Sequence, residues 1–357
     1  MATPTRTHTV ALDEGRVMTV DDTGDPHGVP VLYLHGTPDS RLARHPDDGL
    51  AAAAGVRLLA VDRPGYGGSS PLAPPWSPRW PDCLARDVAR TLDALRVERC
   101  PVLAWSGGAL AAVALAASSG TPPSPGSGPP SPGSATTTPP VPATTTPPGS
   151  GTTTPPGSGT PRTAPDLAPA VGPAPLAGRV TAMGIVAGLV PRQAYDDPAV
   201  RVAGMNRLGV VEMADIVAPG ELGPEVAPML APHPCDRALA AEHQAEHRSA
   251  ADTAELATVP GGADRMAAAL VEAVAGGLAG VAADVEAQAR PIPVDLGAVA
   301  CPVHLWYGSD DVVTPPAFGR WYETHLRHAS LTVVAGAAHY LAFTRWAEML
   351  STLAIAA

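Results

Sequence analysis

Three residues far apart in the chain are of the types that carry out nucleophilic catalysis. Ser106 stands directly after one apolar run, and Asp311 and His339 follow two later apolar runs. Serine is a poor nucleophile at neutral pH, so it needs an imidazole to take its proton, and the imidazole needs a carboxylate to orient it. The chain order serine, aspartate, histidine therefore predicts a catalytic triad.

The residues around Ser106 are typical of a sharp turn between a strand and a helix. The apolar run 100–105 ends in Ser-Gly-Gly, and an Ala-rich run follows. Small neighbours, here Ala104 and Gly108, allow the strand and the helix to approach closely while the serine hydroxyl is presented to a cleft. We expect Ser106 to adopt a strained backbone conformation at the apex of this turn.

The other candidate residues also follow strand-like runs. Because open α/β sheets bind ligands at the carboxyl ends of their strands, this placement predicts one shared cleft. The runs and the polar or Gly-rich turns that end them cover residues 29–38, 56–69, 179–188, 302–315 and 331–340.

Together these motifs and their order resemble the α/β-hydrolase superfamily, in the branch of small serine hydrolases with a separate cap. The resemblance implies a doubly wound, mostly parallel eight-stranded sheet, the α/β-hydrolase fold, with a helical cap. It implies that Ser106 is the nucleophile, Asp311 the acid and His339 the base. The backbone N–H groups of Thr37 and Gly107 are expected to form the oxyanion hole.

The resemblance also guides the choice of acid and pocket. Asp311 is preferred over Asp310 because the acid of the family usually stands three residues after the glycine that ends the strand. His35, Gly36 and Trp105 are expected to line the substrate pocket, although a core role fits His35 and Trp105 as well.

Two positions depart from the family pattern. Ala104 replaces the first glycine of the nucleophile turn, which is a sterically mild change. Asp39 stands where a small residue is common, and we expect its carboxylate near the oxyanion hole to impede anionic substrates.

One segment differs in composition from the rest of the chain. Residues 121–175 contain eighteen prolines, and residues 118–161 carry no charge. Such a segment has little apolar surface to bury, so we expect it to be disordered and most simply a solvated expansion; a docking or glycosylated stalk is the alternative. The predicted organisation is a first core part at 1–117, this insert at 118–176, a core strand at 177–191, a helical cap at 192–285 and a second core part at 286–357.

Charge and targeting signals exclude several classes of partner. Thirty-four acidic residues against 23 basic ones give a net charge of −11, which opposes binding to nucleic acid or to an anionic membrane. We find no signal peptide and no apolar run that could span a bilayer, and therefore expect a cytoplasmic protein. Four cysteines predict no disulfide framework. A small-molecule substrate is expected, with no metal and no other cofactor, and the oligomeric state stays open.

The predicted activity is hydrolysis of a small-molecule carboxylic ester through an acyl-enzyme. The same triad also serves peptides with an amino-terminal proline, lactones and carbon–carbon bonds next to a carbonyl, so these substrates remain open. We also consider two other classes of function: a non-catalytic member of the fold that binds a ligand in the cleft, and a zinc protease. The zinc alternative rests on His243-Gln-Ala-Glu-His247, which matches the His-x-x-Glu-His pattern but lacks an evident third ligand.

Overall fold

The computed structural model describes residues 3–72, 77–120, 176–230 and 236–357, and the structural statements below concern these residues. Residues 121–175, which form nearly all of the predicted insert, lie outside the described residues. The expectation that the insert is disordered is therefore not examined by the structure.

The described chain forms an eight-stranded sheet in the order β1-β2-β4-β3-β5-β6-β7-β8. Strand β2 pairs antiparallel with both β1 and β4, and every other pairing is parallel. This topology confirms the predicted mostly parallel sheet. The strands are β1 Thr3–Ala11, β2 Val17–Gly24, β3 Val29–Leu34, β4 Val56–Val61, β5 Cys100–Trp105, β6 Val180–Val186, β7 Val303–Gly308 and β8 Ala329–Val334.

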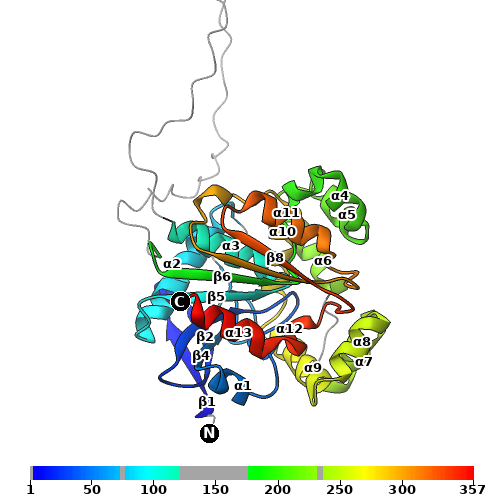
Figure 1. Ribbon diagram of the computed structural model, residues 1–357. Coiled ribbons are helices and arrows are strands. Elements are labelled where there is room, and N and C mark those ends of the chain that lie inside the picture. The colour runs from blue at the N-terminus through cyan, green and yellow to red at the C-terminus, as the bar shows by residue number, and fades with distance from the viewer. Residues whose placement is uncertain (1–2, 73–76, 121–175, 231–235) are drawn as a thin grey trace, which may run out of the picture. The chain divides into compact units, whose positions relative to one another are not determined.

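Helices cover both faces of the sheet, which confirms the doubly wound fold class (Figure 1). One face packs against α2, α3 and α11, and the other against α1 and α13. Strand β5 is buried along its whole length because it lies between β3 and β6 and has helices on both sides. The core helices are α1 Gly49–Ala53, α2 Trp80–Ala94, α3 Gly108–Ser119, α11 Pro316–His325, α12 Leu341–Thr344 and α13 Trp346–Ile355, with one short 3-10 helix, η1 Asp13–Gly15.

A second group of helices lies between β6 and β7 in the chain, and Figure 1 shows α4 to α9 beyond one end of the strands. These helices pack on one another through small apolar clusters, for example Leu222 with Val285 and Ala240 with Leu270. The group, which we call the β6–β7 helices, consists of η2 Arg192–Asp196, α4 Pro198–Ala203, α5 Met205–Met213, α6 Leu222–Leu230, α7 Arg237–His247, α8 Ala250–Ala257, α9 Gly262–Ala273, α10 Ala279–Ala289 and η3 Leu296–Ala298.

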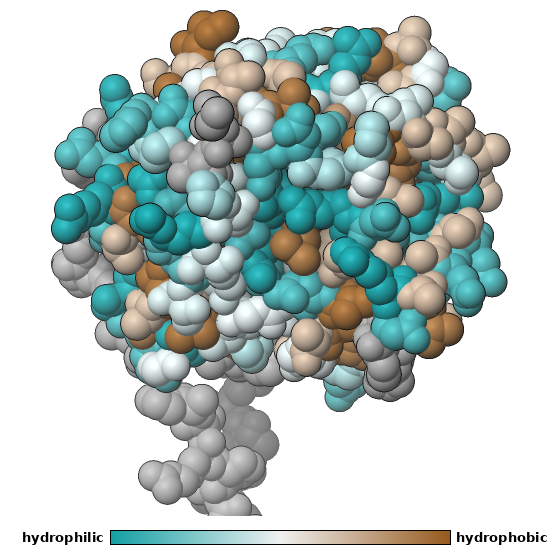
Figure 2. All heavy atoms as spheres, turned by 90° about the horizontal axis from the view of Figure 1, so that it is seen from below, coloured by the Kyte–Doolittle hydropathy of each residue, from teal (hydrophilic) through white to brown (hydrophobic). Residues whose placement is uncertain are grey.

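The surface in Figure 2 is mostly hydrophilic, and its apolar residues form separate spots. Scattered apolar residues of this kind are ordinary on a protein surface. Among the described residues, none of the helices has both the length and the apolar character that crossing a bilayer requires.

Candidate active site

The turn between β5 and α3 holds Ser106 in a conformation that serine rarely adopts. Its φ is +53°, in the left-handed region, where a side chain other than glycine costs roughly 1–3 kcal/mol. Two backbone hydrogen bonds fix it there: the Ser106 N–H donates to the Val186 carbonyl at 3.0 Å, and the Leu189 N–H donates to the Ser106 carbonyl at 3.0 Å. The chain after β6 therefore stabilises the strained turn that the sequence predicts.

Glycine is required on the helical side of this turn. A Cβ at Gly108 would lie 2.6 Å from the Leu34 carbonyl oxygen and 2.7 Å from that of His35, both backbone atoms that cannot move aside easily. Ala104 is fully buried on the strand side. These close contacts place the end of β3 directly against the start of α3.

The structure brings Ser106, His339 and Asp311 together in one line of hydrogen bonds. The His339 Nε2 atom lies 3.1 Å from the Ser106 Oγ, and its Nδ1 atom lies 2.9 Å from the Asp311 Oδ2. The three residues follow the carboxyl ends of β5, β8 and β7. In the sheet β5 and β7 lie on the two sides of β6, and β8 lies beside β7. The three residues that the sequence predicts as nucleophile, base and acid are thus in direct contact.

Asp311 and its neighbour Asp310 differ sharply in environment. Asp311 is 3% exposed and accepts hydrogen bonds from the N–H groups of Val313 and Thr314 and from the Thr314 hydroxyl, at 2.7 to 2.8 Å. Asp310 is exposed and accepts only the Ser309 hydroxyl within the described chain. Of the two, only Asp311 contacts His339.

The charges of His339 and Asp311 each favour the ionised form of the other residue. Burial alone would lower the pKa of His339, but the charge of Asp311 and the hydrogen bond between them outweigh it and raise that pKa above 6.5. Burial would raise the pKa of Asp311, yet the charge of His339 and the hydrogen bonds from His339 and Thr314 hold it below 3.8. The carboxylate is therefore ionised at neutral pH and favours a protonated imidazole.

The two residues predicted for the oxyanion hole, Thr37 and Gly107, lie against each other, and Gly107 directly follows Ser106. Among the described residues, no acceptor takes a hydrogen bond from the backbone N–H of Thr37 or Gly107. The Thr37 hydroxyl is engaged elsewhere, with the Asp284 carboxylate and, at 3.3 Å, with the Gln288 amide. A Cβ at Gly107 would lie 2.1 Å from the Thr37 Oγ1, so these two turns are in tight contact.

His339 is also held by its backbone from two directions. Its N–H donates to the Asp252 carboxylate at 2.8 Å, and its carbonyl accepts the Trp105 indole N–H at 3.0 Å. Asp252 forms a capping box with Ser249 at the start of α8. The Ser-x-x-Asp spacing signals such a cap in the sequence, but nothing in the sequence indicates that the same carboxylate reaches His339.

A cavity of about 890 Å³ opens in front of Ser106 and His339 and is lined by both the core and the β6–β7 helices. Trp105, one of the three residues expected in the substrate pocket, lies on its wall, and so does Thr37. His35 and Gly36, which we expected there, are not on the wall. His35 is fully buried behind the cavity wall, between the ends of β3 and β4. Its Nε2 accepts the backbone N–H of Arg63 at 3.0 Å.

Asp39 lies on the wall of the same cavity, which we call the catalytic cavity. It is 6% exposed, and its burial raises the pKa of the carboxyl to about 8, although the charges of Arg63 and His339 act in the opposite direction. Below that pH the group is mainly a neutral acid. The expected repulsion of anionic substrates by Asp39 is therefore weak at neutral pH.

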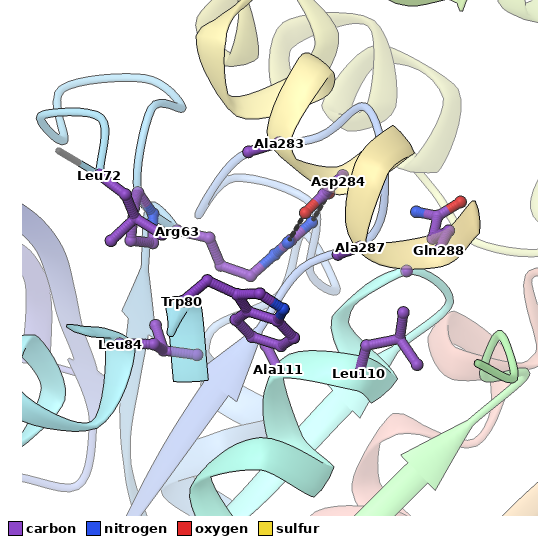
Figure 3. A pocket seen from close by; sticks show the side chains of 12 residues that line it. Arg63, Leu72, Trp80, Leu84, Leu110, Ala111, Ala283, Asp284, Ala287 and Gln288 are labelled. Atoms are coloured by element: carbon purple, nitrogen blue, oxygen red, sulfur yellow. Dashed lines mark hydrogen bonds and ion pairs between the residues drawn. The ribbon is translucent and has the colours of Figure 1, made fainter. Parts of the chain in front are cut away.

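A smaller cavity of about 530 Å³, shown in Figure 3, has Gly107 among the residues that line it. Trp80, Leu84 and Leu110 give it an apolar wall, and the ion pair between Arg63 and Asp284 crosses one side. No feature of the sequence indicates this cavity.

The histidines of the alternative zinc motif lie on α7 and face the catalytic cavity. The rings of His243 and His247 are 4.2 Å apart, and the His247 Nδ1 contacts the His243 carbonyl at 2.7 Å. Within the described residues, no group of three or more side chains has the arrangement of a metal site.

Comparison with known protein families finds a family model that matches part of this sequence. A family model described as alpha/beta hydrolase fold matches residues 29–125, which hold β3, β4, β5 and the turn at Ser106. No curated protein matches the sequence.

Several solved structures are similar over nearly the whole chain. An esterase from Rhodococcus sp. ECU1013 has 17% sequence identity and a TM-score of 0.57, with 98% of both chains covered. An alpha/beta hydrolase fold protein from Nakamurella multipartita has 21% identity and a TM-score of 0.53, covering 97% of this chain and 99% of the other. An enol-lactonase from Burkholderia xenovorans LB400 has 14% identity and a TM-score of 0.56, covering 98% and 99%. At these identities the likeness is one of fold.

Proposed function

We propose that the chain is an α/β-hydrolase, as the family model matched at residues 29–125 and the likeness in fold suggest, and that it is a serine hydrolase that cleaves small carboxylic esters through an acyl-enzyme. The observation that carries the proposal is the unbroken line of hydrogen bonds from Ser106 through His339 to Asp311. A strained serine turn beside a cavity that is open to a small molecule supports it further.

In the first half of the reaction, the Ser106 Oγ attacks the carbonyl carbon of the ester. His339 donates its Nδ1 proton in a hydrogen bond to Asp311, so its Nε2 is free to accept the proton that leaves Ser106. The imidazolium then gives that proton to the departing alcohol. The products of this step are the acyl-enzyme and the free alcohol.

In the second half, His339 removes a proton from water as the water attacks the acyl carbon, and the proton returns to Ser106 as the acid leaves. Both halves pass through a tetrahedral oxyanion. The free N–H groups of Thr37 and Gly107 would donate to this oxygen, where each such donor is typically worth about 3 kcal/mol.

The β6–β7 helices would act as the cap of the site. Residues from α5, α7, α8 and α9 line the catalytic cavity opposite Ser106, so these helices limit the access of water and the shape of the substrate. A lactone is an internal ester and undergoes the same steps, so it falls within the same proposal.

An amide with a free amino terminus fits the cavity less well. Binding an ammonium group needs a carboxylate that is ionised and free. Of the two carboxyl groups on the wall, Asp39 is largely protonated at neutral pH, and Asp252 already accepts the N–H groups of His339 and Ser249. This distribution favours esters over peptides with an amino-terminal proline.

An activity screen tests the proposal. The substrates are p-nitrophenyl esters of graded chain length together with matched amides, lactones and thioesters. We expect turnover of short esters and stoichiometric labelling by a fluorophosphonate probe that Ser106→Ala abolishes. A wild-type protein that is neither labelled nor active on any of these compounds would contradict the proposal and favour a ligand-binding role.

A further inference from the structure

Arg207 on α5 has no carboxylate within ion-pair distance in the described part of the chain. Burial lowers the pKa of its guanidinium, and the charges of Tyr195 and Asp311 oppose this effect from farther away. The Arg207 side chain lies on the wall of the catalytic cavity with Ser106 and His339. The Nε atom is buried and has no hydrogen-bond partner, and the hydrogen bond of the guanidinium in the described chain is a long one, 3.3 Å from Nη1 to the Gln288 amide oxygen. Arg207 as a whole is half-buried, but its buried Nε donor is left without an acceptor, so this arrangement is incomplete.

Three other arginines of the β6–β7 helices are paired with nearby carboxylates. Arg192 forms ion pairs with Asp196 and Asp215, Arg201 with Glu212, and Arg290 with Glu286. No described carboxylate lies within ion-pair distance of Arg207. Arg207 lines the cavity and, in the described part of the chain, has no such ion pair.

The remaining charges of the cavity do not compensate for Arg207. A second arginine on the wall, Arg248, donates from its Nε to the Gln244 carbonyl at 3.0 Å and lies over the Tyr340 ring. Of the carboxyl groups on the wall, Asp39 is mainly protonated, and Asp252 is bound to backbone N–H groups. Within the described chain, both arginines on the cavity wall thus lack a carboxylate at ion-pair distance.

Arg207 also lies at a position where it would contact a group of the bound substrate, because it lines two neighbouring cavities. The same side chain lines a neighbouring apolar cavity of about 1050 Å³, whose wall includes Leu189, Val210 and Val285. Its charge is close enough to the triad to lower the pKa of His339, against the larger opposing effect of Asp311. A group bound to Arg207 would thus lie at the boundary between the two cavities and near the reacting serine.

We propose that Arg207 binds a carboxylate carried by the substrate, so that the preferred substrates are esters with an anionic acyl or alcohol part, such as half-esters of short dicarboxylic acids. The planar guanidinium matches a carboxylate with two parallel hydrogen bonds, and the apolar cavity accommodates the hydrocarbon part. This assignment rests on the proposed ester hydrolysis and specifies its substrate class.

Paired substrates test the proposal. Mono-p-nitrophenyl glutarate is compared with p-nitrophenyl pentanoate, and 4-acetoxybenzoate with its methyl ester, for wild type, Arg207→Gln, Arg207→Lys and the control Arg201→Gln. Arg201 carries the same charge on the neighbouring helix α4 but lies outside the cavity. We expect the wild type to prefer the anionic member of at least one pair. Arg207→Gln should reduce the kcat/KM ratio of that pair by about tenfold to a hundredfold, Arg207→Lys by less, and Arg201→Gln not at all.

Binding of glutarate, measured by calorimetry with glutaramide as the neutral control, tests the anion site without turnover. We expect glutarate binding that is weakened in Arg207→Gln. If neither ester of either pair is hydrolysed but glutarate binding depends on Arg207, ester hydrolysis is wrong and the anion site stands. If the neutral esters are equally good substrates, or the ratio and glutarate binding are the same in Arg207→Gln, the anion site is wrong while ester hydrolysis stands. If Arg207→Gln does not fold, the proposal is still tested by the kcat/KM ratios of the ester pairs in the wild type and in Arg207→Lys.

Discussion

Arg63 and Asp284 form an ion pair between two parts of the molecule that lie 221 residues apart in the chain. Both terminal nitrogens of Arg63, which follows β4, donate to the Asp284 carboxylate on α10 at 2.6 Å (Figure 3). The same guanidinium donates to the carbonyls of His35 and Gly36, and the Thr37 hydroxyl contacts the same carboxylate. One buried cluster thus connects α10 to the loop that carries the Thr37 N–H.

Removing this carboxylate should affect both stability and catalysis. We expect Asp284→Ala to lower the free energy of unfolding by about 3 kcal/mol, because it leaves a buried guanidinium unpaired. It should also lower kcat more than it raises KM, since Thr37 would no longer be held beside Gly107. Chemical denaturation and steady-state kinetics measure the two effects. The control Glu212→Ala removes an exposed ion pair and should change stability by less than about 1 kcal/mol; equal losses in both variants would contradict the role of Asp284.

The triad residues should rank in a definite order. We expect Ser106→Ala and His339→Ala to reduce kcat to less than about a hundredth of the wild-type value while the fold is retained. Asp311→Asn should fall nearly as far because it loses the charge that orients and stabilises His339. Asp310→Asn is the matched control, since that carboxylate is exposed and does not contact His339, and its kcat should be close to wild type. The reverse ranking of the two aspartates would move the acid to Asp310.

The pH profile of activity should report the state of His339. A protonated imidazole cannot accept the proton of Ser106, so kcat/KM should rise with pH through an apparent pKa above 6.5, the direction set by Asp311. In Asp311→Asn the residual activity should show this pKa at a lower value, because burial then acts without the opposing charge. Profiles with one small ester over pH 5 to 9 measure both values, and an unchanged midpoint in the variant would contradict the coupling.

Asp39 should make stability depend on pH in the opposite sense to an ordinary ion-paired carboxylate. Its pKa is about 8 in the folded protein, against an ordinary value of 3.8, so the folded state holds a proton that the unfolded state has lost. Stability from this group therefore decreases as the pH rises from about 4 to 8. The Tm of Asp39→Asn relative to wild type should increase over this range, because the amide cannot ionise. A Tm difference that stays constant between pH 5 and 8 would contradict the raised pKa.

Residues 121–175 should be dispensable for folding. The chain on either side of them is already joined, because the Gly178 N–H donates to the Ser119 carbonyl at 2.8 Å and the Val180 N–H donates to the Ser119 hydroxyl at 2.9 Å. A variant in which a short Gly-Ser turn replaces these residues should keep its Tm within a few degrees and its kcat/KM on small esters. A selective loss of activity on bulky esters would show instead that the segment belongs to the substrate site.

Local sequence was enough to predict the strands β3 to β8 and the order of the candidate triad, whereas β1 and β2 were expected only through the eight-stranded sheet that the family resemblance implies. The strand-like run before Ser106, the small residues around it and the polar turns at Asp311 and His339 are properties of short segments, and parallel strands bring their carboxyl ends to one edge. The choice of Asp311 over Asp310 already required the family resemblance, because two adjacent aspartates cannot be distinguished by composition.

Contacts between distant segments could be learned only from the folded chain. Arg207, Asp252 and Asp284 are ordinary charged residues of helices in the sequence, and their significance comes from what each meets: an open cavity, the backbone of His339, and Arg63. Burial acts in the same way, because it turns Asp39 from an expected anion into a mainly neutral acid and places His35 behind the cavity. Charge, burial and pairing depend on the whole packed structure, and no short stretch of sequence encodes them.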